Sequence, residues 1–275
     1  MIGGQTYLER PPHPALAERI SSVWTQQVAH DAAPYAHRTI PNGAVEISVR
    51  LGSALRVIGP QTAPTEDVLA PGAAVVGVRL RHGAAPSLLG VPASELVDLT
   101  VDASELWGDD AARLEEALSS ATAARGAAVL ERAVLARMPE AAPLDPIVAE
   151  TVRGLLPGGA DEEIASLSSR LFISERQLRR RCLAAVGLAP KPLQRTLRFQ
   201  GFLALAHARG LTGADLGALA AEAGYADQPH LNRESVRLAG SSPLTVLRGA
   251  EEHCRGVHDH AASYAPLVRS FARAA

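Results

Sequence analysis

Residues 174–190, SERQLRRRCLAAVGLAP, contain the start and end signals of a short helix together with a cluster of arginines. Ser174 and Gln177 have the spacing of a capping box, in which the serine accepts from the glutamine's amide and the glutamine side chain reaches back. Gly187 stands where a left-handed residue commonly ends a helix. We therefore predict a helix between Ser174 and Gly187. Its inward stripe is expected to be Leu178, Cys182 and Ala185 or Val186.

Three arginines lie on the opposite, outward face of this predicted helix. Arg176, Arg179 and Arg180 stand at i, i+3 and i+4, which share one side of a helix. A guanidinium group can grip guanine O6 and N7 with two hydrogen bonds and can also clamp a phosphate, so this face suits the major groove of DNA. The alternative, that these arginines are only the solvated side of a surface helix, stays open at this point.

A second unit of the same layout follows along the chain. Helical patterns cover residues 190–208, 215–223 and 227–238, and a short helical pattern near residues 162–170 precedes the first unit. Two units of a short helix, a turn and a capped helix therefore stand in tandem, which is the layout of two helix-turn-helix modules. The connecting helix spans about 28 Å at 1.5 Å per residue, which approaches the roughly 34 Å between successive major grooves on one side of a duplex.

The chain divides at MPEAAPL, residues 138–144, where two prolines interrupt helical patterning on both sides. Before this linker, short apolar runs indicate strands, and helical stripes follow between residues 104 and 138. In residues 44–51 apolar and polar positions alternate, so that one side of a strand would be apolar. We expect an α+β protein whose parts are a β-rich domain with helices over 1–137, the linker, an all-α domain over 145–255 and a tail over 256–275. The apolar side of the strand is expected to be Val45, Ile47, Val49 and Leu51.

The composition excludes several classes of protein. Of the 275 residues, 47% are hydrophobic and 20% are charged, which leaves no case for a disordered chain or a coiled-coil rod. Two cysteines, Cys182 and Cys254, are too few for a disulfide scaffold and suit a reducing compartment. The first residues lack a basic start before an apolar run, and no apolar stretch approaches the roughly 18 residues of a membrane span. We therefore expect a cytoplasmic protein without membrane contacts.

The net charge of −2 is unevenly divided. Residues 1–144 carry 11 basic and 16 acidic side chains, whereas residues 145–255 carry 14 basic and 12 acidic ones. The helical part is therefore the basic part. Because this excess is small, the case for nucleic-acid binding depends on whether the arginines share a face.

Residues 145–252 resemble the DNA-binding domain of the AraC/XylS family of bacterial transcription regulators. The matching segments are SERQLRRR at 174–181, GLAP at 187–190 and AAEAGYADQPHLNRE at 220–234. The resemblance implies that two recognition helices read bases. The residues implicated by position are Arg176, Arg179 and Arg180 in the first helix, and Gln228, His230, Asn232 and Arg233 in the second. Phosphate contacts are expected of Arg181, Arg195, Arg198 and Arg237, each of which could equally be a surface arginine.

The sequence departs from the family's pattern at several positions. Phe172 stands in the first turn, where glycine is common, and Ser235 and Val236 replace a bulky aromatic and a basic residue. Ala239 replaces a further aromatic before a glycine. Losing two aromatics would cost several kcal/mol if nothing refilled the space. The second module is therefore predicted to be looser than the first, or to read less sequence.

The segment up to residue 137 resembles the amino-terminal domain of one AraC-like subgroup, through IPNG at 40–43, GVRLR at 77–81 and LGVP at 89–92. In the wider family this domain is a small cupin-like β-barrel that binds an effector or mediates dimerisation. The resemblance implies an apolar pocket for a small molecule. It would be lined by some of Trp24, Tyr35, His37, Glu46, Arg79 and His82. The alternatives are a core position for Trp24 and a solvent-facing Glu46.

No catalytic or cofactor signature is present. The sequence has no nucleophile elbow, phosphate-binding glycine loop, His-Glu-x-x-His or paired Cys-x-x-Cys motif. His253, Cys254, His258 and His260 could hold a soft metal, but histidines near a helix end commonly only complement the helix dipole. We expect neither a metal nor a cofactor, and we expect Cys182 to be a small packed hydrophobe.

These observations favour a transcription regulator rather than an enzyme. Its expected partners are double-stranded DNA, a small-molecule effector and, as a further candidate, RNA polymerase, and the chain could be a monomer or a homodimer. The alternative hypothesis is a small-molecule-binding protein or enzyme whose helical half no longer binds DNA specifically. The effector, the operator and the sign of regulation do not follow from the sequence.

Overall fold

The strand expected within residues 44–51 lies inside a large mixed sheet. The computed structural model describes residues 4–158, 162–210, 216–253 and 257–272, with the backbone alone for 250–253 and 257. The sheet order is β8-β5-β4-β7-β2-β1-β9, and β3 pairs with β6 in a separate two-stranded sheet. Neighbouring strands of the large sheet are antiparallel except β1 and β9. The bounds are Gln5–Arg10 for β1, Ile20–Val28 for β2, Tyr35–Thr39 for β3, Glu46–Arg50 for β4, Leu55–Ile58 for β5, Thr65–Leu69 for β6, Ala74–Leu80 for β7, Thr100–Asp102 for β8 and Val257–Asp259 for β9.

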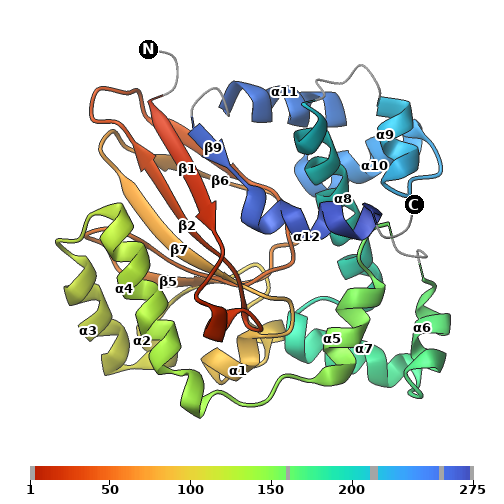
Figure 1. The fold of residues 1–275 in the computed structure, drawn as a ribbon, viewed down its shortest axis with the longest axis horizontal. Helices are drawn as coiled ribbons and strands as arrows, with labels where there is room; N and C mark the ends of the chain where they lie inside the picture. The colour runs from red at the N-terminus through yellow and green to blue at the C-terminus, as the bar shows by residue number, and fades with distance from the viewer. Residues whose placement is uncertain (1–3, 159–161, 211–215, 254–256, 273–275) are drawn as a thin grey trace.

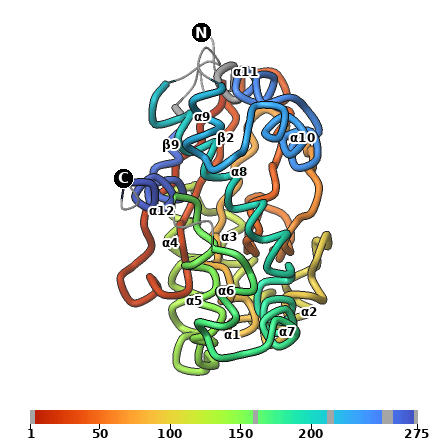
Figure 2. The backbone as a smooth tube through the Cα atoms, turned by 90° about the vertical axis from the view of Figure 1, so that its right-hand side faces the viewer, coloured from red at the N-terminus to blue at the C-terminus, as the bar shows by residue number. Residues whose placement is uncertain are grey.

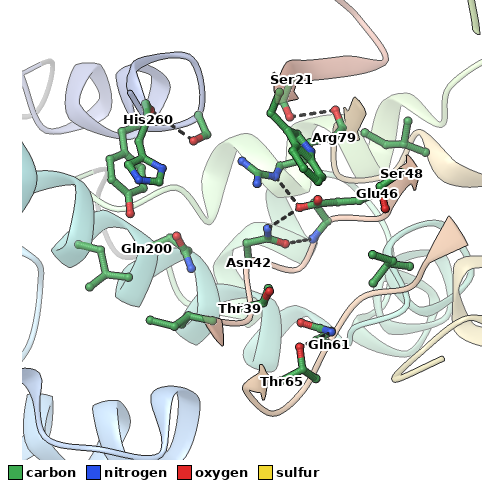
Figure 3. Close-up of a pocket in the computed structure, with 18 of the residues that line it drawn as sticks. Ser21, Thr39, Asn42, Glu46, Ser48, Gln61, Thr65, Arg79, Gln200 and His260 are labelled. Atoms are coloured by element: carbon green, nitrogen blue, oxygen red, sulfur yellow. Dashed lines mark hydrogen bonds and ion pairs between the residues drawn. The ribbon is translucent and has the colours of Figure 1, made fainter. Parts of the chain in front are cut away.

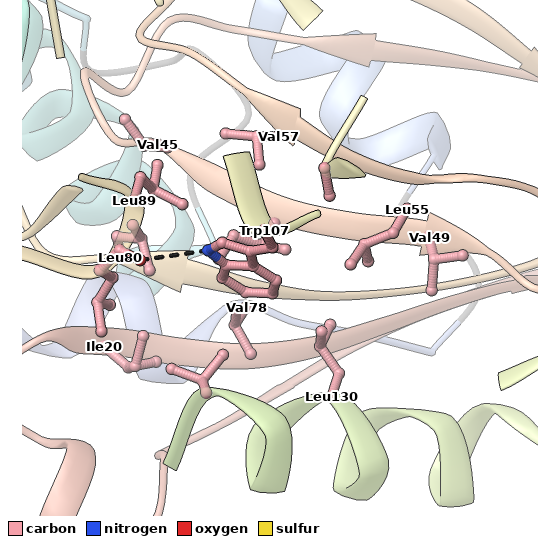
Figure 4. Close-up of a cluster of buried hydrophobic side chains, with 14 of the residues drawn as sticks. Ile20, Val45, Val49, Leu55, Val57, Val78, Leu80, Leu89, Trp107 and Leu130 are labelled. Atoms are coloured by element: carbon pink, nitrogen blue, oxygen red, sulfur yellow. Dashed lines mark hydrogen bonds between the residues drawn. The ribbon is translucent and has the colours of Figure 1, made fainter. Parts of the chain in front are cut away.

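One face of the large sheet is apolar and packs on helices. Ile47 and Val49 on β4 are buried beside their partners Val78 and Val76 on β7, which confirms the predicted alternation. Helix α4 packs directly on β2 and β7, and α2 and α3 lie beside it in Figure 1. Trp107 lies in this core, where its Nε1 donates to the Leu88 carbonyl at 3.2 Å (Figure 4). The short helices of this part are η1 (Pro14–Leu16), α1 (Ala85–Leu89), η2 (Ala93–Glu95), α2 (Ser104–Trp107), α3 (Asp109–Leu118), α4 (Ala123–Ala136) and η3 (Met138–Glu140).

The other face of the sheet is polar but still largely covered. Alternation places Ser22, Gln26 and Ser48 there, and all three side chains are buried. Buried polar side chains need partners or water, so this face does not pack like an ordinary core. Helices α8 and α12 lie on this side, and a cavity separates them from parts of the sheet.

The second half of the chain is helical, as predicted. The capping box of Ser174 and Gln177 is present, and Gly187 and Gly210 end their helices in the left-handed conformation. The fold class inferred from the sequence, a β-rich domain followed by a helical domain with two helix-turn-helix modules, is confirmed. Residue 215, the expected start of one helix, lies outside the described residues. The helices are α5 (Pro146–Gly154), α6 (Ile164–Arg170), α7 (Glu175–Val186), α8 (Pro190–Arg209), α9 (Leu216–Glu222), α10 (Gln228–Ala239) and α11 (Pro243–His253).

Helix α8 carries two separate cores along its length. Leu193 and Leu197 in its first half pack with α5, α6 and α7. Phe199 and Phe202 in its second half pack with α9, α10 and α11. Its 20 residues span about 30 Å. The helix therefore holds the two modules at opposite ends of one rod, as Figures 1 and 2 show.

The last described segment returns to the amino-terminal sheet. Residues 256–275 were expected to be a tail, and they contain β9 and helix α12 (Ala261–Ala272). Strand β9 pairs with β1, and α12 packs against α8, β1 and β2. Phe271 reaches the core around α9 and α10. This segment therefore ties the sheet to the second module.

Two departures from the family pattern have structural consequences. Phe172 has φ +55° and is 95% exposed. A bulky residue therefore occupies a left-handed turn position, and burial of its side chain does not offset the strain. Ser235 and Ala239, which replace aromatics, are fully buried. The Ser235 hydroxyl donates to the Ser241 carbonyl at 2.7 Å, so the second module closes around small residues.

Candidate DNA-binding face and ligand cavity

The outward face of α7 consists of exposed arginines. Arg176, Arg179 and Arg180 are all exposed, and none has an ion pair or hydrogen bond among the described residues. Leu178 and Cys182 on the opposite face are fully buried. Burial, helped by the charge of Asp145, raises the pKa of the Cys182 thiol to about 12, so it remains a packed thiol near neutral pH. The helix therefore presents three unpaired cations to solvent.

Two other arginines expected at the interface are paired with carboxylates of the protein itself. Arg181 Nη1 lies 2.5 Å from Oδ2 of Asp145, the residue that caps α5. Arg195 on α8 makes two hydrogen bonds of 2.6 Å to the carboxylate of Glu234 on α10. Both guanidinium groups thus hold helices together, and neither is a free cation like those on α7.

The outward face of α10 is polar with less charge. Gln228, Asn232 and Arg233 are exposed, and Asp227 caps the helix by accepting from the amide of His230 at 2.6 Å. The His230 ring is half-buried and lies edge-on to Tyr225, with 5.3 Å between the ring centroids. The guanidinium carbon of Arg198 lies over the Tyr225 ring, 5.8 Å from its centroid. Arg237 is exposed.

A cavity of about 1470 Å³ lies between the polar face of the sheet, α8 and α12. Its wall is built from residues that the sequence places far apart, on β2, β3, β4 and β7 and in the loop after β7 (Figure 3). The structure brings all six sequence-predicted ligand residues to this one cavity. They are Trp24, Tyr35, His37, Glu46, Arg79 and His82.

A buried ion-pair network forms one wall of this cavity. Glu46 and Arg79 are cross-strand partners, and Arg79 Nε donates to Glu46 Oε1 at 2.8 Å. Arg79 Nη1 donates to Glu9 Oε1, also at 2.8 Å, across strand β2. The residue of β2 opposite Arg79 is the small Ser22, which leaves the guanidinium room to cross. Only 16% of the Arg79 side chain and none of the Glu9 side chain is exposed.

The pKa directions in this network follow from burial and pairing. Burial alone would raise the pKa of Glu9, but the charge of Arg79 and hydrogen bonds from Ser263 and Tyr7 leave it below its usual value. Burial alone would lower the pKa of Arg79, and the neighbouring anionic groups raise it well above its usual value. Glu9 therefore stays a carboxylate and Arg79 a guanidinium.

Several cavity residues were not foreseen from the sequence. Gln5, Tyr7 and Glu9 stand at every second position of β1 and share its buried side. This spacing was the sequence signal that could have indicated Tyr7 and Glu9. Asn42 donates to Glu46 Oε1 at 3.2 Å and accepts from the Ala44 amide. His260 and Tyr264 come from the segment expected to be a tail, and no local pattern indicates that they reach this cavity.

The two histidines of the predicted pocket are held by neighbouring groups. His82 Nε2 lies 2.9 Å from the Asn42 carbonyl, and burial lowers the pKa of His82. His37 Nδ1 lies 3.1 Å from Gln26 Nε2, and His37 Nε2 lies 3.1 Å from the Thr39 hydroxyl. Both imidazoles are therefore positioned by hydrogen bonds at the cavity wall.

The amino-terminal part contacts both helix-turn-helix modules. Arg38 on β3 donates to the carbonyl of Ala239, the last residue of α10. Gln200 on α8 donates to the Pro41 carbonyl at 2.9 Å. At the other end of the rod, a methyl group on Gly187 would lie only 2.9 Å from the Ala93 carbonyl, so the end of α7 abuts η2. The amino-terminal part is thus linked to both ends of the helical part.

Over the described ranges, no helix is both long and apolar enough to cross a membrane. Within those same ranges, no group of three or more potential ligands is placed to hold a metal ion. Cys254, part of the metal-site alternative, lies outside the described residues, and the side chain of His253 is not described.

Comparisons with known proteins identify two domains. Residues 8–102 match a domain of unknown function, DUF6597, and residues 167–249 match a helix-turn-helix domain, HTH_18. No curated protein matches the sequence.

Among solved structures, an apo form of ToxT from Vibrio cholerae aligns at 12% identity and a TM-score of 0.44, covering 87% of this chain and 99% of that one. Unsaturated fatty acid bound wild-type ToxT from the same organism aligns at 11% identity and a TM-score of 0.40, covering 88% and 94%. Structural similarity at these TM-scores does not identify a functional site in this chain. The domain match agrees with the paired modules of Figure 1, and residues 167–249 are therefore an AraC-type helix-turn-helix domain, which confirms the resemblance of this part of the chain to the AraC/XylS family.

Proposed function

We propose that this protein is a sequence-specific DNA-binding transcription regulator whose α7 and α10 enter adjacent major grooves and whose cavity binds a small-molecule effector. The observation that carries the proposal is the face of α7, where Arg176, Arg179 and Arg180 are exposed and have no ion-pair or hydrogen-bond partner among the described residues. Arg181 and Arg195 of the same domain are instead engaged with carboxylates. Unpaired guanidinium groups on the second helix of a helix-turn-helix module are suited to guanine edges and phosphates.

The two modules are assigned different parts in this proposal. Helix α7 would contribute guanine and phosphate contacts, whereas Gln228 and Asn232 on α10 offer amides that suit adenine edges. Because Arg181 and Arg195 are engaged within the protein, we assign them to holding the helices in place. Arg198, His230, Arg233 and Arg237 remain candidate DNA contacts of the second module.

Effector control would act through the contacts between the cavity and the modules. Arg38 lines the cavity and also donates to the last carbonyl of α10, so a ligand that moves β3 changes the support of this helix. A ligand can shift the balance between arrangements only by its difference in affinity for them. Residues 1–137 would sense the effector and residues 145–255 would bind DNA, while RNA polymerase contact and the monomer or dimer state stay predictions.

The test is DNA binding by variants of the full chain. A duplex would be selected from a random library, and its affinity measured by fluorescence anisotropy at two salt concentrations. Arg179→Ala should weaken binding to the selected sequence by about 1 to 3 kcal/mol and relax preference at one base pair. Arg153→Ala, which removes an exposed arginine of α5, is the matched control and should leave affinity unchanged. Absence of any sequence preference in the wild-type protein would contradict the proposal and favour the alternative in which DNA binding is lost.

A further inference from the structure

Six aromatic and imidazole rings form one continuous cluster at the cavity wall. Its members are Tyr7, Trp24, His207, His258, His260 and Tyr264, and all of them line the cavity. The Tyr7 and His260 rings stack with 4.8 Å between centroids, and His260 stacks on Tyr264 at 5.4 Å. The rings come from the sheet, from α8 and from the carboxy-terminal segment. We call this group the ring cluster.

The ion-pair network beside the ring cluster has a net negative charge. Glu9 and Glu46 supply two carboxylates and Arg79 a single guanidinium, so one negative charge is left over. Glu9 is saturated, because it accepts from Arg79, from the Tyr7 hydroxyl at 2.6 Å and from the Ser263 amide at 2.9 Å. Glu46 bonds through Oε1, and its Oε2 makes no hydrogen bond within the described part of the chain. Since 13% of its side chain is exposed, Glu46 is the carboxylate that a ligand can reach.

Among the residues that the structure describes, no buried cation other than Arg79 balances this charge. Burial lowers the pKa of His260 to about 4, although the charge of Glu9 opposes this shift, so its imidazole is neutral near pH 7. Besides Arg79, five arginines line the cavity and all are exposed: Arg38, Arg50, Arg56, Arg81 and Arg153. Arg38 and Arg81 donate to the backbone carbonyls of Ala239 and Ala17. Charges exposed to solvent are screened over short distances and contribute little inside the cavity.

We propose that the cavity recognises an organic cation, an amine on an apolar body, whose charged nitrogen bonds to the free Oε2 of Glu46 and whose body lies against the ring cluster. Ring faces attract a cation through their quadrupole, and a carboxylate with a free oxygen accepts its N–H bonds. An anionic ligand would instead meet the uncompensated negative charge. Figure 3 shows the opening between these groups, with Glu46 and Arg79 on one side and His260 and Gln200 on the other. This inference rests on the proposed function, because it names the chemical class of the effector.

The test compares three probes of one shape and different charge. Isothermal titration calorimetry of the full chain would use 4-phenylbutylamine, 4-phenylbutanol and 4-phenylbutyrate at pH 7.5 and low salt. We expect the amine to bind at least tenfold more tightly than the alcohol, and the carboxylate more weakly than the alcohol. Equal or tighter binding of the carboxylate, or no binding of any probe at millimolar concentration, overturns the inference without any variant being made.

A charge-removing variant locates the site. Glu46→Gln should weaken amine binding at least tenfold and change alcohol binding less than twofold, because its amide keeps the size of the side chain. Glu66→Gln is the matched control, since Glu66 also lines the cavity but is exposed on β6. If Glu46→Gln leaves the preference for the amine intact, the cation is not held where we place it. DNA binding measured on the same wild-type protein separates the two proposals, because it can fail while amine binding persists.

Discussion

The ion pair between Arg195 and Glu234 offers a strong test of how the second module is held. Both hydrogen bonds are 2.6 Å long, and the side chains are only 23% and 13% exposed. A fully exposed pair contributes about 0 to 1 kcal/mol, whereas breaking a buried pair costs about 3 to 5 kcal/mol. The exposure of the Arg195–Glu234 pair lies between that of a fully exposed pair and that of a fully buried pair. We expect Arg195→Ala to lower the free energy of unfolding by about 2 kcal/mol.

A double-mutant cycle isolates the interaction itself. The variants are Arg195→Ala, Glu234→Ala and the double variant, with unfolding by urea followed by circular dichroism at pH 7.5. Contacting charged groups of this kind show coupling energies of about 0.5 to 3 kcal/mol, and we expect a value of about 1 to 2 kcal/mol. Arg176→Ala is the matched control, because it removes an exposed arginine without a partner and should change stability by less than about 0.5 kcal/mol.

The same variants decide between the two roles considered for Arg195. If it holds α10 on α8, the salt dependence of DNA binding should keep its slope in Arg195→Ala. If it contacts a phosphate, stability should hardly change and the slope should fall by about one unit. A coupling energy below about 0.5 kcal/mol together with a reduced slope would refute the structural role.

Three further predictions concern stability. Phe172→Gly should raise the free energy of unfolding by about 0.5 to 1 kcal/mol, because relief of the left-handed strain outweighs the backbone entropy that glycine adds to the unfolded chain. Phe172→Ala keeps the strain and is the comparison in thermal unfolding. Ser174→Ala removes the capping box and should cost about 1 kcal/mol in urea unfolding, and an unchanged midpoint would contradict the capping role. The unfolded His260 imidazole titrates near 6.5 and the folded one near 4, so protons bind the unfolded state first as the pH falls. Stability should therefore drop by about 2 kcal/mol between pH 7.5 and 5, and His260→Asn should remove this part of the drop.

Much of the helical half could be predicted because its signals are local. A cap, a left-handed glycine or a stripe of apolar residues depends on neighbours within about four positions. Ser174, Gly187 and Gly210 therefore mark their helix ends correctly from the sequence alone. The exposed face of α7 followed from the same reasoning, since its inward stripe determined which side remained for the arginines.

The candidate ligand site was only partly predictable. Glu46 and Arg79 were selected through a family resemblance, yet nothing near either residue reveals that they pair across two strands and share Glu9. The contribution of the carboxy-terminal segment was missed. The Ser263 amide bonds to a carboxylate 254 positions earlier in the chain, and no local pattern encodes such a contact.

The sequence by itself determined the helix boundaries, the alternation of the central strands and the outward arginines, because short-range sterics and hydrogen bonding decide these features. The tertiary structure alone decided which arginines are free. Arg181 and Arg195 look like Arg179 in sequence, but each meets a carboxylate only after the helices pack. It also decided the charge of the cavity, which depends on how two carboxylates and one guanidinium from separate strands are brought together away from water.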